Sequence, residues 1–89
     1  MKTHEIKCNP EYYQPIINGA KRFEIRYNDR NYKVNDYLLI KEHTLTGYTG
    51  RYCLCRIVYI LDSPMYLQSG YVCLSIMLLN MYDNKKSDC

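Results

Sequence analysis

The sequence predicts a small α+β domain in which a mostly antiparallel, five-stranded sheet closes partly into a barrel and one short helix caps one opening. The chain has 89 residues, enough for one domain with a compact core but not for two. Five segments show strand patterns, whereas one shows apolar residues at helical spacing. Partial closure would protect the strand edges of so short a chain. We expect a single domain at 1–82 and a polar tail at 83–89.

The first strand is expected at 4–8, because Ile6 and Cys8 alternate with charged neighbours. A helix should follow from Asn9-Pro10, where Asn9 can accept a hydrogen bond from an unpaired N–H and proline suits the first helical position. Its apolar face comprises Tyr12, Tyr13, Ile16 and Ile17. Pro15 predicts a short or kinked helix, which should end at Asn18-Gly19.

The second strand should start at Lys21, with Phe23 and Ile25 on one face and charged side chains on the other. The third is expected at 37–42 and the fourth at 51–61. Turn residues at Gly47-Tyr48-Thr49-Gly50 should join the third and fourth strands into a hairpin. The last strand, at 71–79, is an almost unbroken apolar run, which is typical of a strand covered on both faces.

Charge is concentrated between Lys21 and Lys33. Five basic residues and two acids give this segment +3, which equals the formal net charge of the whole chain. A positive field on one short segment attracts phosphate or carboxylate groups. With a total of only +3, a small ligand such as a nucleotide or modified base fits the charged row better than an extended strand does. The positive charge of this segment therefore predicts a ligand that is anionic as well as small.

Composition argues against several other classes. The five cysteines form no Cys-x-x-Cys pair, so neither a disulfide framework, a zinc site nor another metal or cofactor is expected. The charged N-terminus does not resemble a signal peptide, and no window approaches the ~20 apolar residues of a membrane span. We expect a cytoplasmic protein without a membrane partner. The eleven tyrosines can fill strands or stack on a base.

A motif that follows the short helix and opens the second strand is similar to the signature of the ASCH domain family in the PUA-like superfamily. It reads Gly19-x-Lys21-x-x-Glu24-x-Arg26. One branch, of small uncharacterised bacterial and phage proteins with a domain of unknown function, shares further stretches. These are His4-Glu5-x-Lys7, Phe23-Glu24-Ile25-Arg26-x-Asn28-Asp29-Arg30, Val34-x-Asp36, Glu42, Gly47-Tyr48-Thr49-Gly50-Arg51 and Gly70-Tyr71-Val72-x-Leu74-Ser75-Ile76. The resemblance implies a PUA-like β-barrel with a cleft between helix and barrel that binds RNA or a nucleotide.

Some proteins of this family resemble amidohydrolases that remove an acyl group from a modified cytidine. They use the motif lysine, a threonine at the position of Glu24 and a downstream glutamate. This chain lacks that threonine, and no glutamate follows Glu42. The catalytic set is incomplete, so the sequence predicts a binding protein before an enzyme.

Glu24 and Arg26 are two residues apart on a strand and share a face, which Lys21 can reach from the strand's start. Arg26 could hold a phosphate or base edge, Lys21 could supply a point charge, and Glu24 could accept from a base amino group. The candidate ligand-binding residues are Lys7, Lys21, Glu24, Arg26, Asn28, Asp29, Arg30 and Tyr48. The structural alternative is that Glu24–Arg26 and Asp29–Arg30 are ion pairs that only link a strand to a loop.

Three functions remain open. The first is a non-catalytic module that binds RNA or a nucleotide. The second is a hydrolase of a modified nucleoside, with Lys21 as base and Glu24 as its acid/base partner. The third is a phage protein that binds another protein through its tyrosine-rich surface. The oligomeric state does not follow from the sequence.

Overall fold

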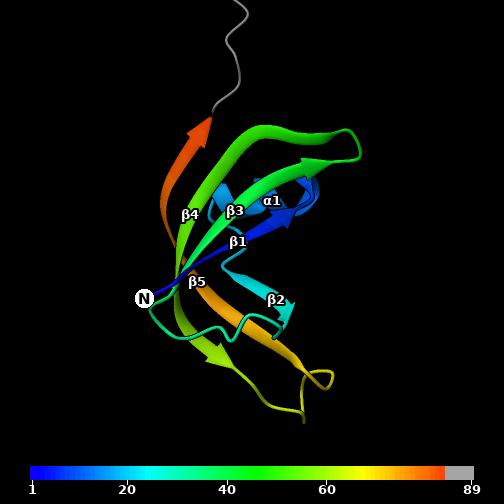
Figure 1. Cartoon of the computed structure of the whole chain (residues 1–89), viewed down its shortest axis with the longest axis vertical. Coiled ribbons are helices and arrows are strands. Elements are labelled where there is room, and N and C mark those ends of the chain that lie inside the picture. The colour runs from blue at the N-terminus through cyan, green and yellow to red at the C-terminus, as the bar shows by residue number, and fades with distance from the viewer. Residues whose placement is uncertain (84–89) are drawn as a thin grey trace, which may run out of the picture.

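The computed structural model describes residues 1–83, which form one helix and one five-stranded sheet (Figure 1). The elements in chain order are β1 (Thr3–Cys8), α1 (Pro10–Ile17), β2 (Phe23–Tyr27), β3 (Tyr37–Thr44), β4 (Gly47–Leu61) and β5 (Tyr71–Asp83). The predicted α+β class is confirmed. Of the predicted tail at 83–89, Asp83 is the last residue of β5 and the other residues lie outside the described ones. Within residues 1–83, no helix has the length and apolar character needed to cross a membrane.

The strands lie in the order β1-β3-β4-β5-β2. β1 pairs with β3 in parallel, and the other three pairs are antiparallel, so the sheet is mixed. It curls into a half-barrel, because the long strand β4 bends and pairs with β3 from Gly47 to Arg56 and with β5 from Arg51 to Leu61 (Figure 1). This leaves β1 and β2 as the two edges. The predicted hairpin between the third and fourth strands is confirmed.

The core lies inside the curl and is built from alternate residues of the strands together with one side of α1. Its largest fully buried side chains are Ile6, Tyr13, Ile16, Leu38, Ile40, Ile57 and Leu74. Cys53 and Cys55 are also buried, and the four described cysteines are free thiols. Burial of the helix against β3 and β5 fixes where its ends lie relative to the sheet.

The helix ends where the sequence predicts. Gly19 has a φ of +86°, the left-handed conformation that glycine adopts at low cost, and Pro15 lies inside the helix. Its beginning differs in mechanism from the prediction. The Asn9 side chain makes no capping hydrogen bond; instead the N–H groups of Tyr12 and Tyr13 donate to the Asn9 carbonyl oxygen.

Three strand predictions are wrong in detail. The tight turn of the hairpin is at Leu45-Thr46, not at 47–50, because the Thr44 hydroxyl accepts from the Thr46 N–H and donates to the Gly47 carbonyl. β2 begins at Phe23 rather than Lys21. β5 is covered on one face only: Val72, Leu74 and Ile76 are buried, whereas the alternate residues contact solvent to varying degrees. A half-barrel with one helix has nothing to cover its outer face.

Candidate functional site

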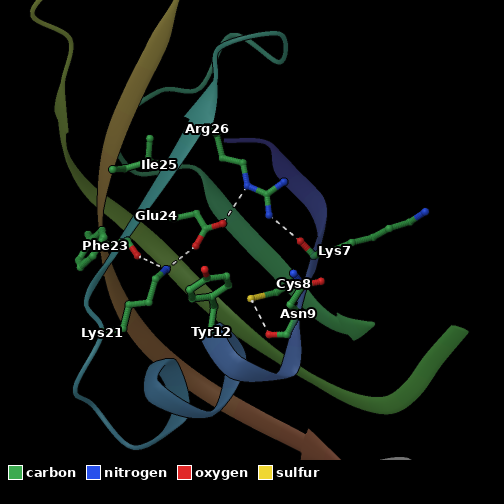
Figure 2. Close-up of a pocket in the computed structure, with 9 residues that line it drawn as sticks. All are labelled: Lys7, Cys8, Asn9, Tyr12, Lys21, Phe23, Glu24, Ile25 and Arg26. Carbon is green, nitrogen blue, oxygen red and sulfur yellow. Dashed lines mark hydrogen bonds and ion pairs between the residues drawn. The ribbon is translucent and has the colours of Figure 1, made fainter. Parts of the chain in front are cut away.

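A cleft opens where the two edge strands face each other. It has a volume of about 430 Å³ and lies between the end of β1, the start of α1 and the whole of β2 (Figure 2). The residues that line it are Lys7, Cys8, Asn9, Tyr12, Lys21, Phe23, Glu24, Ile25 and Arg26. We call this opening between β1 and β2 the seam cleft.

Main-chain groups of β2 face the seam cleft. The Asn28 N–H donates to the Gly70 carbonyl, and the Ile76 N–H donates to the Arg22 carbonyl, so the even-numbered residues of β2 bond to β5. Peptide groups alternate in direction along an antiparallel strand. The N–H and C=O of Ile25 therefore point toward the cleft and away from β5.

Glu24 is the centre of the site. It is only 6% exposed, and its two carboxylate oxygens accept from Lys21 Nζ at 2.7 Å and from Arg26 Nε at 2.8 Å. Figure 2 shows the carboxylate between the two cations. The charged face of β2 is thus turned inward, while Phe23 and Ile25 are exposed on the outer face. Glu24 and Arg26 form the ion pair that the structural alternative predicts.

The two cations are anchored to the backbone as well. Lys21 Nζ donates to the Phe23 carbonyl at 2.7 Å, and Arg26 Nη2 donates to the Lys7 carbonyl. Arg26 thereby links β2 to β1 across the cleft. The three side chains together carry a net charge of +1, which suits a ligand with both an anionic group and hydrogen-bond donors.

Cys8 lies beside this triad but is not a nucleophile. Burial, and after it the nearby Glu24 carboxylate, raise the pKa of its thiol to about 11, although Lys21 and Arg26 act to lower it. Since the thiolate is the reactive form, a protonated thiol is inert near neutral pH. Its Sγ donates to the Asn9 carbonyl at 3.6 Å. The cleft thus offers no thiolate for covalent catalysis.

The turn residues that the sequence grouped with the triad do not line the cleft. Asn28 is structural, because its side-chain oxygen accepts from the Tyr32 N–H. Arg30 donates to the Glu5 carbonyl on β1 and lies 4.0 Å from the exposed Asp29 carboxylate. The turn holds the end of β2 against β1.

Lys7 and Tyr48 also lie apart from the triad. The Lys7 carbonyl accepts from Arg26 at the cleft, but the Lys7 side chain extends away from Glu24 (Figure 2). Its Nζ lies 6.0 Å from the centre of the Tyr48 ring, on the hairpin of β3 and β4. Four of the eight candidates therefore line the cleft, and Lys7 alone among them also contacts Tyr48.

A further residue at the cleft is Tyr12, which α1 places there with its hydroxyl toward the triad (Figure 2) and which the sequence pattern does not predict as a site residue. It was assigned to the apolar face of the helix, yet it is half exposed, whereas Tyr13 is buried. The proximity of Tyr12 to the Asn9-Pro10 helix start was the available signal, since the first turn of a helix that follows an edge strand lies beside that edge.

Two further charged clusters lie outside the cleft. Glu42 is buried and accepts from Arg51 Nε and Nη2, each at 2.9 Å, and from the Thr49 hydroxyl at 2.7 Å. The second cluster is a buried pair in which His4 Nε2 lies 2.8 Å from Asp36 Oδ2. Burial alone would raise the pKa of Asp36, but hydrogen bonds from His4 and from two N–H groups outweigh it and lower the pKa. Both clusters fix backbone segments.

No group of three or more potential metal-ligating side chains of His, Cys, Asp or Glu occurs within residues 1–83. The seam cleft itself contains one carboxylate and one protonated thiol. Two cations already bond that carboxylate, so a metal ion would have to displace them. Organic ligands with polar edges fit the cleft better.

Comparison with known proteins agrees with the expected likeness to small uncharacterised phage proteins. Residues 3–76 match the family described as Domain of unknown function (DUF3850). The chain is also 36% identical over 77 residues to an uncharacterized 12.9 kDa protein in the GpA 3′ region of Escherichia phage P2, an overlap of 86% of this chain and 70% of that protein. Because the family match spans most of the sequence and includes the whole seam cleft, the chain belongs to the DUF3850 family.

Proposed function

We propose that this protein binds RNA or a nucleotide in the seam cleft through Lys21, Glu24 and Arg26. The observation that carries the proposal is the burial of Glu24 between two cations beside an open cleft instead of inside the core. The cost of desolvating charges offsets most of their mutual attraction. A buried carboxylate paired with two cations therefore stabilises the fold little more than apolar side chains would. Its position at a cleft favours a role in recognition.

The groups at the cleft match the chemistry of a nucleotide. A lysine ammonium has three N–H donors and an arginine guanidinium five, whereas the hydrogen bonds within residues 1–83 engage two of each. The remaining donors can bind phosphate or carbonyl oxygens. Glu24 can accept from an exocyclic amino group, and the peptide edge of Ile25 offers the donor and acceptor pair that a base edge requires.

Size and sequence resemblance support the same ligand. A volume of about 430 Å³ falls in the range of small-molecule sites and is suited to one nucleotide. The resemblance to the ASCH domain family adds weight, because its motif residues Lys21, Glu24 and Arg26 are the charged side chains at this cleft. A PUA-like identity for the half-barrel belongs to this proposal.

The test is a thermal-shift screen against nucleotides, modified nucleosides and short single-stranded RNAs at low and moderate salt. The wild-type chain should be stabilised by at least one of them, because a ligand that binds only the folded state raises its stability. The shift should disappear in the Lys21→Ala/Arg26→Ala variant. Lys33→Ala, which removes a charge outside the cleft, is the matched control and should keep the shift.

Two results would overturn the proposal. One is that no nucleotide, nucleoside or RNA stabilises the wild-type protein. The other is that the double variant, shown by circular dichroism to be folded, is stabilised as strongly as the wild type.

A second candidate is hydrolysis of a modified nucleoside. It is favoured by the 2.7 Å contact between Lys21 Nζ and Glu24, which places an amine and a carboxylate side by side at the cleft. Lys21 is engaged as a double hydrogen-bond donor, however, which is the arrangement of an ammonium that binds and not of a base that accepts a proton. Incubation with acylated cytidines decides the question: turnover that Lys21→Ala abolishes would establish the enzyme.

A further inference from the structure

A second group of side chains on the outer face of the sheet has the composition of a nucleic-acid subsite. Tyr48 on β4 is 53% exposed and packs edge-to-face on His43, its cross-strand partner on β3, with ring centres 5.0 Å apart. Lys41 Nζ lies 5.4 Å and Lys7 Nζ 6.0 Å from the centre of the Tyr48 ring. Three strands therefore place two ammonium groups around one exposed aromatic ring. We call Lys7, Lys41, His43 and Tyr48 the hairpin platform.

Space for a base lies next to the platform. A hollow of about 200 Å³ is lined by Lys41, Tyr48, Gly50, Arg51 and Tyr52. Arg51 donates two hydrogen bonds to Glu42, so the positive charge that can face a ligand here comes from the lysines. Lys41 forms an exposed pair with Glu5 at 3.0 Å, while no ion pair of Lys7 occurs within residues 1–83. An exposed ring with neighbouring cations is the arrangement on which unpaired bases stack while their phosphates are neutralised.

Lys7 connects the platform to the seam cleft. Its carbonyl accepts from Arg26 inside the cleft, whereas its ammonium lies at Tyr48 on the other side of β1. Figure 2 shows the Lys7 side chain extending away from the triad, and Tyr48 lies on β4, which is separated from β1 by β3 in the sheet. A mononucleotide cannot fill both, but a chain of two or more nucleotides can cross β1 with its phosphate near Lys7.

We propose that the ligand is a single-stranded oligonucleotide, with one nucleotide in the seam cleft and a neighbouring base stacked on Tyr48. This inference rests on the proposed function and extends it from a nucleotide to a strand. It also revises the expectation from the low net charge, because Lys7 adds a positive group outside the charged segment at 21–33, whereas Lys41 is paired with Glu5. Since stacking requires an unpaired base, duplexes should not bind at the platform.

The experiment measures the affinities of a mononucleotide, a dinucleotide and a tetranucleotide by calorimetry, with RNA and DNA of the same sequence as separate arms. Longer ligands should bind more tightly to the wild type. Tyr48→Leu should weaken tetranucleotide binding about tenfold and leave mononucleotide binding unchanged, whereas Tyr48→Phe should keep the ring and the affinity. Lys7→Met should reduce the salt dependence of tetranucleotide binding by about one phosphate contact. Tyr59→Leu, at an exposed tyrosine at the other end of β4, is the matched control.

The outcomes separate this inference from the proposed function. If the mononucleotide binds, and added length or Tyr48→Leu changes nothing, the oligonucleotide inference is wrong while the cleft proposal stands. If a tetranucleotide binds through Tyr48 and Lys7 but not through Lys21 and Arg26, the cleft proposal falls, and so does the inference of a strand that spans both places; the platform alone is then the binding site. If no nucleic acid binds, both fall and the exposed tyrosines become candidates for a protein contact.

Discussion

Arg26 on one edge of the sheet donates a hydrogen bond from Nη2 to the main-chain carbonyl of Lys7 on the other edge. The strands β1 and β2 share no ladder, and each ends the five-stranded sheet on its own side. A side chain therefore spans the gap that a sixth strand would fill in a closed barrel. Arg30 makes the same kind of contact with β1 two residues before Lys7, where it donates to the Glu5 carbonyl.

These two arginines make a matched pair for mutation. Arg30→Ala should lower the free energy of unfolding by about 1 kcal/mol, because it removes a donor to an edge carbonyl that water then only partly replaces. Arg26→Ala should lower it further, because it also removes one of the two cations that bond the buried Glu24 carboxylate. Only Arg26→Ala should also abolish nucleotide binding, since Arg30 does not line the cleft. Urea denaturation and calorimetry measure the two effects. Equal loss of binding in both variants would contradict the assignment of the cleft.

The His4–Asp36 contact predicts a loss of stability in acid. Despite the desolvation that opposes it, the pKa of Asp36 lies below its ordinary 3.8 in the folded state. The unfolded chain consequently takes up the proton more readily, so the contribution of Asp36 is complete above pH 3.8 and is lost as the pH falls through the lower folded-state value. Urea denaturation over this window should show the slope.

Asp36→Asn provides the control for that experiment. It should cost about 1–3 kcal/mol near neutral pH, because the buried hydrogen bonds from His4 and the Lys2 and Lys33 N–H groups lose their charged acceptor. Its stability should change less with pH than that of the wild type below pH 3.8. An unchanged slope would assign the acid sensitivity to other carboxylates.

Cys8 should resist alkylation in the folded protein. With the pKa of its thiol raised to about 11 by burial and by Glu24, the thiolate is scarce at about pH 8. Iodoacetamide followed by peptide mass spectrometry should show Cys8 labelled far more slowly than in urea. Glu24→Gln, which removes one of the two causes, should speed the labelling. Rapid labelling of the native wild type would contradict the assigned pKa.

Gly70 and Gly19 form a second matched pair. Both have positive φ, +85° and +86°, so alanine at either position should cost about 1–2 kcal/mol through backbone strain. A Cβ at Gly70 would also lie 2.5 Å from the Tyr27 ring, whereas no atom lies within 4 Å of one at Gly19. Thermal unfolding should therefore show the larger loss for Gly70→Ala. Equal losses would mean that Tyr27 moves aside at no cost.

Local signals predicted the helix well and the hairpin turn badly. Pro10 and Gly19 act through their own backbone preferences, so their positions alone locate the ends of α1. Gly47 and Gly50 also take positive φ, as turn glycines do, but they lie within β4. The turn itself uses Leu45 and Thr46, which carry no strong turn preference and are placed by the pairing of His43 with Tyr48.

Alternation along β2 predicted which residues share a face but not which face is buried. That choice depends on β1, which lies opposite β2 across the cleft and supplies the Lys7 carbonyl that holds Arg26. The charged face turns inward because its groups find partners there, and Phe23 and Ile25 are left outside. The His4–Asp36 contact joins two residues far apart in the sequence, which period and propensity cannot report.

A sheet edge with unpaired peptide groups can recruit strands from other chains and begin aggregation. In this half-barrel the two edges face each other, and arginine side chains occupy carbonyls that a foreign strand would otherwise use. Long side chains can move aside for a ligand without breaking any pairing within the sheet, which a sixth strand could not do. The arginine contacts therefore leave fewer free carbonyls on β1 for a foreign strand and still leave the seam cleft open to a ligand.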